Sequence, residues 1–232
     1  MSCKHKLKLM IVKAGAAFDC FLVCTAMLLL IIGMVAADKK FYNAQFEKQN
    51  SAEEVGLTKS EINKVRDKII GYFAGKTDDI QVYVSFNGGE PKPFFSADEI
   101  SHMHDAKVVF TAVRIAGWVL LGVGLGLVIL TFRSFSFGAI VGPICLALLF
   151  AVLGLIIAID FDKAFEAFHG IFFPQGNWQF NTPMVEVLND EFFMEAAFTI
   201  LIRAASFAAV MVMCGLAAKI LTRRKVNVTL TT

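Results

Sequence analysis

The stretch Ser96-Ala-Asp-Glu-Ile-Ser-His-Met-His-Asp-Ala-Lys107 joins a polar segment to an apolar run of membrane length, Val108–Phe132. Ser96 is followed three residues later by Glu99, the spacing of a capping box at the start of a helix. No proline interrupts the sequence that follows. The pattern therefore predicts one helix that begins in polar sequence, carries His102 there, and continues through the apolar run.

The composition points to a membrane. The 232 residues are 56% hydrophobic and only 18% charged, whereas soluble domains are about 25% charged. Four apolar runs are each long enough to span a hydrocarbon core of about 30 Å. These runs are 14–37, 108–132, 137–159 and 196–221. The sequence predicts an α-helical integral membrane protein with four transmembrane helices in the lipid bilayer.

Basic residues predict the orientation of these spans. They flank the runs at Lys4, Lys6, Lys8, Lys13, Arg133, Lys219, Arg223, Arg224 and Lys225. By the positive-inside rule, three segments are expected to be cytoplasmic: the tail 1–13, the turn 133–136 and the tail 222–232. The segments 38–107 and 160–195 then lie outside. Because this topology accounts for the net charge of +2, no nucleic-acid partner is expected.

The first outer segment, 38–107, is expected to form a small α+β extracytoplasmic cap. Thr58 and Glu61 have capping-box spacing before an amphipathic stripe that ends near Phe73. Ile80–Phe86 reads as a strand, and prolines in the segment after Asn87-Gly88 restrict the returning arm to an edge. Neither outer segment contains cysteine, which excludes a cap held by disulfides.

The second outer segment, 160–195, begins with phenylalanines at helical spacing, which predicts an amphipathic helix at the outer interface. These residues are Phe161, Phe165, Phe168 and Phe172. The aromatic belt of a membrane protein explains part of this pattern but not His169 among the rings. His102 and His169 thus both lie at the membrane surface, and two imidazoles there form a candidate acid/base pair.

Charged residues near these histidines are candidate supporting groups. Glu99 and Asp105 each lie three residues from His102, and Glu166 lies three residues before His169, so each carboxylate is within reach of an imidazole. Arg114 and Arg203 lie in the outer halves of their spans, at a depth where a charge is costly and usually paired or functional. The alternative is that both arginine side chains snorkel to the interface.

No activated nucleophile is evident, because the chain has no Gly-x-Ser-x-Gly and no cysteine in its outer segments. Two other functions stay open. One is a metal-dependent membrane hydrolase with His102, His104 and His169 as ligands, although histidines two apart on a helix diverge by roughly 200°. The other is a non-catalytic assembly or sensor protein whose histidines are merely interfacial.

Two motifs resemble those of the bacterial lipoprotein intramolecular transacylase family. The first is Glu99-x-x-His102-Met103-x-Asp105-x-Lys107, and the second is Phe168-His169-x-x-Phe172-Phe173-Pro174-x-x-x-Trp178-x-Phe180. The four-span layout with an outer cap is similar too. Two departures are Ala106, where valine is commoner, and Asn189-Asp190, where a proline is expected.

The resemblance implies an acyltransferase of the bacterial cytoplasmic membrane. Such an enzyme moves the sn-2 acyl chain of a diacylglyceryl-modified lipoprotein onto the amino group of its N-terminal cysteine, giving the lyso-form. By motif, His102 and His169 carry this chemistry. We expect no cofactor and no metal, because both reacting groups belong to one substrate. We also expect an apolar substrate pocket lined by Met103, Phe165, Phe168, Phe172, Phe173, Trp178 and Phe180.

Overall fold

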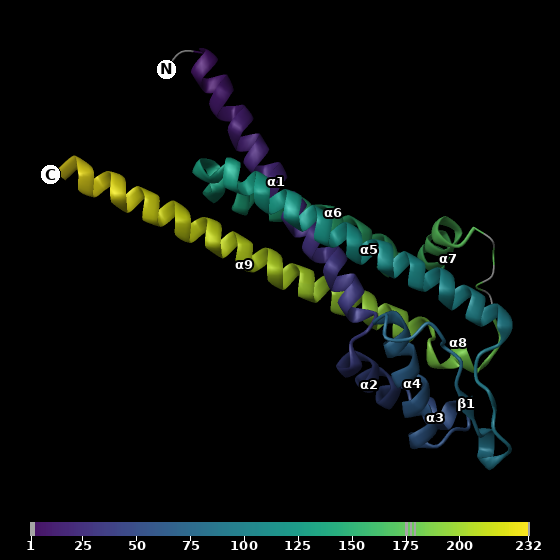
Figure 1. Ribbon diagram of the computed structural model, residues 1–232. Helices are drawn as coiled ribbons and strands as arrows, with labels where there is room; N and C mark the ends of the chain where they lie inside the picture. Colours follow the sequence, from purple (N-terminus) through teal and green to yellow (C-terminus); the bar gives the residue numbers. More distant parts are fainter. Residues whose placement is uncertain (1–2, 175, 177, 179, 232) are drawn as a thin grey trace. The chain divides into compact units, whose positions relative to one another are not determined.

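The computed structural model describes residues 3–174, 176, 178 and 180–231, and it describes side chains only within 4–222. Long helices make up most of the chain (Figure 1). They are α1 (Cys3–Val35), α5 (Ala97–Leu130), α6 (Phe135–Ile159) and α9 (Asp190–Thr231). All four are long and apolar enough to cross a membrane. The predicted helical protein with four candidate spans is confirmed at this level.

The helices extend beyond the apolar runs that predicted them. Helix α1 begins at Cys3 rather than near 14, and α9 runs from Asp190 to Thr231 rather than from 196 to 221. Hydropathy marks only the part of a helix that lipid can surround, whereas backbone hydrogen bonding continues through polar residues until a breaker or a cap ends it. Residues 1, 2 and 232 of the two predicted tails lie outside the described residues.

Shorter elements connect the long helices. They are α2 (Lys39–Lys48), α3 (Ser51–Glu54), α4 (Lys59–Phe73), β1 (Tyr83–Val84), η1 (Phe86–Gly88), β2 (Lys92–Pro93), η2 (Phe132–Ser134), α7 (Phe161–Phe172) and α8 (Pro183–Val187). Helices α4 and α7 were predicted from their apolar spacing. No helix was predicted at α2, α3 or α8. Helices α3 and α8 have only four and five residues, and the buried aromatic face of α2 is confined to ten.

Side-chain caps set several helix starts. The Thr58 hydroxyl and the Glu61 carboxylate form the predicted capping box of α4. Ser96 and Glu99 do the same for α5, since the Ser96 N–H donates to the Glu99 carboxylate at 2.7 Å and the Glu99 N–H donates to Ser96 Oγ at 3.3 Å. Asn189 accepts from the Phe192 N–H at 3.0 Å. The residue that departs from the family pattern therefore caps α9.

The chain divides into two compact units. The first comprises Met1–Ile31, Arg114–Leu155 and Leu201–Thr232. Within it, glycines let helices approach closely, as is common between membrane helices. A Cβ added at Gly142 of α6 would lie 2.6 Å from the Ala17 carbonyl oxygen of α1, and one at Gly215 of α9 would lie 3.1 Å from the Ala139 side chain of α6.

The second unit comprises Ile32–Val113 and Ile156–Ile200. Its short helices α2, α3 and α4 pack together and α3 contacts α8 (Figure 1). Phe192, at the start of α9, packs its ring 5.1 Å from Tyr42 and 5.2 Å from Phe41 of α2. Lys48 at the end of α2 pairs with two carboxylates of α9, at 2.9 Å and 2.7 Å. The chain before α5 is thus fixed to the start of α9.

The predicted hairpin is present but short. Tyr83 pairs with Pro93 and Val84 with Lys92, so the strand expected over Ile80–Phe86 is reduced to two residues. The proline on the returning arm removes a backbone donor, which limits the ladder. Next to this two-residue ladder, the Gln81 side chain hydrogen-bonds to the backbone of the returning arm. It donates to the Phe95 carbonyl at 2.7 Å and accepts from the Phe95 N–H at 3.1 Å.

Candidate active site

The two predicted histidines lie together in the second unit. His102 is near the start of α5 and His169 is in the last turn of α7. Their ring centroids are 6.0 Å apart and their planes are inclined by 25°. Helix α6 separates α5 from α7 along the chain, so folding brings two remote segments to one place. This separation is small enough for one substrate group to contact both imidazoles.

His169 is held in one tautomer. Its side chain is only 6% exposed, and its Nδ1 lies 2.8 Å from the Phe165 carbonyl oxygen. A carbonyl oxygen can only accept, so Nδ1 carries the hydrogen and Nε2 of the neutral ring carries the lone pair. Burial holds the pKa of His169 below its ordinary value, although the hydrogen bond to Phe165 acts in the opposite direction. The neutral ring can therefore accept a proton through Nε2.

His102 is half-buried among aromatic rings. Its centroid lies 4.6 Å from that of Phe173 and 5.8 Å from that of Phe180. Among the described residues, no group hydrogen-bonds to its buried Nδ1. An unpaired buried polar atom costs about 1–3 kcal/mol. That atom can be satisfied by a substrate group, which favours a functional role for His102 over a purely structural one.

Aromatic side chains surround both imidazoles. The rings nearest His169 are Phe165 at 4.0 Å, Trp178 at 4.6 Å, Phe168 at 5.4 Å and Phe173 at 5.4 Å. We call these four residues, with Phe180 and the two histidines, the histidine cluster. Of the other residues predicted to line the pocket, Met103 is buried on α5 and Phe172 packs 4.8 Å from Phe168. The surroundings of the imidazoles are apolar and suit an acyl chain.

The carboxylates near the histidines do not all act as their spacing suggested. Glu99 is fully buried, and it accepts hydrogen bonds from the Ser96 N–H and the Thr182 hydroxyl. It is not bonded to Nδ1 of His102, which has no partner in the described part of the chain. Glu166 is exposed on α7, and Nδ1 of His169 is bonded to the Phe165 carbonyl instead. Asp105 is half-buried, one turn along α5 from His102.

Thr182 was not identified from the sequence. Thr182-Pro183 is a recognisable helix start, because threonine is a good N-cap and proline is favoured at the first helical position. That signal says nothing about Glu99, which is 83 residues away. Only the tertiary structure reveals this hydrogen bond.

Arg114 and Arg203 belong to the first unit, on α5 and α9. Their role in stabilising a negative charge stays a prediction from the sequence. As for a metal site, the described residues contain no group of three His, Cys, Asp or Glu side chains placed to hold one ion. His104 is exposed, and it lies on a different side of α5 from His102.

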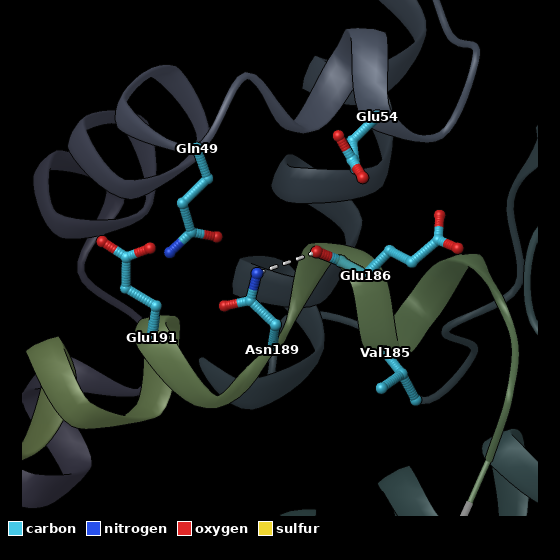
Figure 2. A pocket seen from close by; sticks show the side chains of 6 residues that line it. All are labelled: Gln49, Glu54, Val185, Glu186, Asn189 and Glu191. Atoms are coloured by element: carbon cyan, nitrogen blue, oxygen red, sulfur yellow. Dashed lines mark hydrogen bonds between the residues drawn. The ribbon is translucent and has the colours of Figure 1, made fainter.

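A separate pocket of about 450 Å³ lies between α2, α3 and α8. Its lining consists of Gln49, Glu54, Val185, Glu186, Asn189 and Glu191 (Figure 2). Within it, the Asn189 amide donates to the Glu186 carbonyl oxygen at 3.2 Å. Three of the six lining residues are glutamates, so the pocket is unsuited to an acyl chain. The histidine cluster is the better candidate for lipid chemistry.

Comparison with known proteins identifies a family that matches this chain. The family model described as lipoprotein intramolecular transacylase matches residues 18–193, which include both histidine motifs. A search of curated proteins finds no match.

Three solved structures of the lipoprotein intramolecular transacylase from Bacillus cereus are similar to this chain. One, with a histidine-to-arginine mutation, has a TM-score of 0.76 and 21% identity, and covers 97% of this chain and 100% of its own. Another, with a histidine-to-alanine mutation, has a TM-score of 0.73 and 21% identity, with 96% and 100% covered. A third has a TM-score of 0.68 and 21% identity, with 94% and 97% covered. At this identity the likeness concerns the fold, which is that of a membrane-integral protein.

Proposed function

Because the chain belongs to the lipoprotein intramolecular transacylase family, we propose that it moves the sn-2 acyl chain of a diacylglyceryl-modified lipoprotein to the amino group of its N-terminal cysteine. The observation that carries this proposal, beyond the family, is the pair of imidazoles 6.0 Å apart within apolar rings. An acyl transfer between two groups of one substrate needs orientation and proton handling rather than a nucleophilic side chain.

His169 is the general base in this proposal. The hydrogen bond of Nδ1 to the Phe165 carbonyl leaves Nε2 able to accept a proton from the attacking amine. The amine nitrogen bonds to the ester carbonyl carbon, and the carbonyl oxygen becomes an oxyanion. His102, whose Nδ1 has no hydrogen-bond partner among the described residues, is suited to donate a hydrogen bond to that oxyanion.

Collapse of the tetrahedral intermediate completes the proposed transfer. The bond between the acyl carbon and the glyceryl oxygen breaks, and the proton taken from the amine is returned to that oxygen. The products are an amide on the cysteine nitrogen and a free hydroxyl at the former sn-2 position. No atom or electron is required from outside the substrate.

We also propose the orientation that the basic residues predicted. The protein lies in the bacterial cytoplasmic membrane with both termini inside, and 38–107 and 160–195 face outward. This arrangement puts the histidine cluster on the side where processed lipoproteins carry their lipid. Arg114 and Arg203, which lie in the outer halves of their predicted spans, would then stabilise a carboxylate or the anionic intermediate.

Mass spectrometry of the N-terminal peptide of a diacylated lipoprotein, incubated with the purified protein, tests this function. We expect the acyl chain to move to the amine with wild-type protein. His102→Asn and His169→Asn should each fold in detergent but lose roughly 10²–10⁴-fold in rate, the usual contribution of general acid/base catalysis. His104→Ala should stay active. Loss of activity with a chelator and in the His104 variant would instead support the metal-dependent alternative.

The same assay tests the arginines. Arg203→Leu should abolish transfer or folding if the guanidinium stabilises a carboxylate or the anionic intermediate in the outer half of the membrane. Full activity of that variant would favour the snorkelling alternative.

A further inference from the structure

One partly buried hydrogen bond links two segments that contribute to the histidine cluster. Thr182 donates through its hydroxyl to Oε1 of Glu99. Glu99 lies one turn before His102 on α5, and Thr182 lies two residues after Phe180. The Phe180 ring in turn contacts His102 at a centroid distance of 5.8 Å. The bond therefore fixes the chain at Phe180 relative to the helix that bears His102.

Both oxygens of Glu99 are used in this arrangement. Oε2 accepts from the Ser96 N–H at 2.7 Å while Oε1 accepts from Thr182. The side chain is 1% exposed, and a carboxylate buried that deeply is costly unless donors satisfy it. Removing one donor therefore leaves a strong acceptor unpaired in the interior.

Among the described residues, the Thr182 side chain does not cap α8, although Thr182 is the residue that precedes this helix. It occupies the N-cap position of α8, where a threonine hydroxyl usually accepts from a backbone N–H of the first turn. Within the described residues its side chain makes no such cap hydrogen bond. Its hydroxyl is directed to Glu99 instead, so its main contact joins two segments rather than starting a helix.

The chemistry at the cluster gives this link a function. Water can attack the same ester as the amine, and water needs no orientation. Its oxygen would bond to the acyl carbon, the bond to the glyceryl oxygen would break, and the products would be a free fatty acid and a lyso-lipid with an unmodified amine. Selective transfer therefore requires that the amine be held in place and that water be excluded. His169 is 6% exposed and Phe173 is 4% exposed, which is consistent with exclusion.

We propose that Glu99 and Thr182 are positioning residues that hold Phe180 beside His102 and so direct the acyl group to the amine rather than to water. This inference rests on the two-histidine mechanism proposed above. It assigns no contact with the substrate to either residue. It predicts a change in the products of the reaction, which a loss of stability alone would not cause.

The test is the product ratio of the Thr182→Val variant, which keeps the shape of the side chain but removes the donor. With a diacylated lipopeptide, free fatty acid and N-acylated peptide are measured together. Misplacement by about 1 Å can cost an oriented reaction roughly 10²-fold. We therefore expect the ratio of free fatty acid to transferred acyl chain to rise at least about tenfold. Thr182→Ser restores the hydroxyl and should restore the ratio.

Thr58→Val is the matched control. Thr58 also donates its hydroxyl to a glutamate, Glu61, at 2.9 Å, but it does so in the capping box of α4. Its loss should lower stability without changing the products. Phe180→Ala is a second variant, and it should raise the ratio even with Thr182 intact. A wild-type ratio in Thr182→Val, or an equal rise in Thr58→Val, would overturn the inference.

The His102→Asn and His169→Asn variants separate the two proposals. If either transfers at the wild-type rate, the two-histidine mechanism fails and the inference loses its premise. If both are inactive while Thr182→Val keeps the wild-type ratio, only the inference fails.

Discussion

At His169 a single hydrogen bond decides which ring nitrogen is available for chemistry. The His169 ring is directed back along α7, so that its Nδ1 hydrogen-bonds to the carbonyl oxygen of Phe165, four residues earlier. Both residues of the bond belong to α7, so no other element takes part in it. The rings of Phe165 and Trp178, at 4.0 Å and 4.6 Å, restrict that rotamer. Packing therefore fixes the tautomer.

The depressed pKa of His169 predicts how activity depends on pH. Burial lowers the pKa, so the neutral, proton-accepting form persists below the ordinary value of about 6.5. The attacking α-amino group of the substrate has an ordinary pKa of about 7.7–8.0, so activity should fall about tenfold per pH unit below that value. His169 should add a second, steeper fall only below about pH 6.5, as the pH drops through its folded-state value. The measurement is kcat/KM for acyl transfer across this range. If log kcat/KM already falls by about two per pH unit above pH 6.5, His169 is protonated there and is not the neutral base proposed.

At the residue scale, the sequence predicted the histidines but not their partners. Motif resemblance predicted His102 and His169 as the candidate site. Helical spacing then suggested carboxylate partners three residues away, but the structure pairs His169 with a backbone carbonyl and Glu99 with Thr182. Spacing along a helix indicates which groups can reach one another, and it does not show which competing partner is better placed.

At the scale of elements, close helix packing in the first unit depends on glycine. Gly142 of α6 faces α1 so closely that an added Cβ would lie 2.6 Å from both the Ala17 carbonyl oxygen and the Phe21 nitrogen. These are backbone atoms, which cannot move aside as a flexible side chain can. Among the described residues, nothing lies within 4 Å of a Cβ added at Gly126 of α5.

This contrast predicts that glycine-to-alanine substitutions at the two positions change the stability of the protein in different ways. Gly142→Ala should destabilise the protein by about 1–3 kcal/mol, because the two helices must separate. Gly126→Ala should be neutral or stabilise by up to about 1 kcal/mol, because alanine is the better helix former. Thermal unfolding of both variants in the same detergent measures the difference. Equal stability of the two would show that α1 and α6 are not in this close contact.

The elements themselves were predicted unevenly. The four apolar runs, the phenylalanine stripe of α7 and the two capping boxes each carry a local signal, and each was found in the structure. Helix α8 has only five residues and no stripe. Its position is set by contacts with α3 and by the Thr182 bond, which involve residues far away in the chain. Local patterns cannot contain that information.

At the scale of the whole molecule, the positions of lysine and arginine predict the orientation in the membrane. The predicted cytoplasmic segments carry most of the basic residues that flank the spans. Proposed transfer to an N-terminal cysteine also requires the histidine cluster to face the compartment in which the lipoprotein has already received its lipid. Charge distribution and chemistry thus lead independently to the same orientation.

Cysteine labelling tests this orientation in a variant that lacks the five native cysteines. A single cysteine at Glu90, an exposed residue between β1 and β2, should react with a membrane-impermeant maleimide in intact cells. We prefer Glu90 to Asn87, because Asn87 has a φ of +51° that a cysteine would adopt only with strain. A cysteine at His5, which is exposed near the start of α1, should react only after permeabilisation. Reversal of the two results would place the histidine cluster on the cytoplasmic side, where a lipoprotein with a lipid-bearing N-terminus outside the membrane has no access to it.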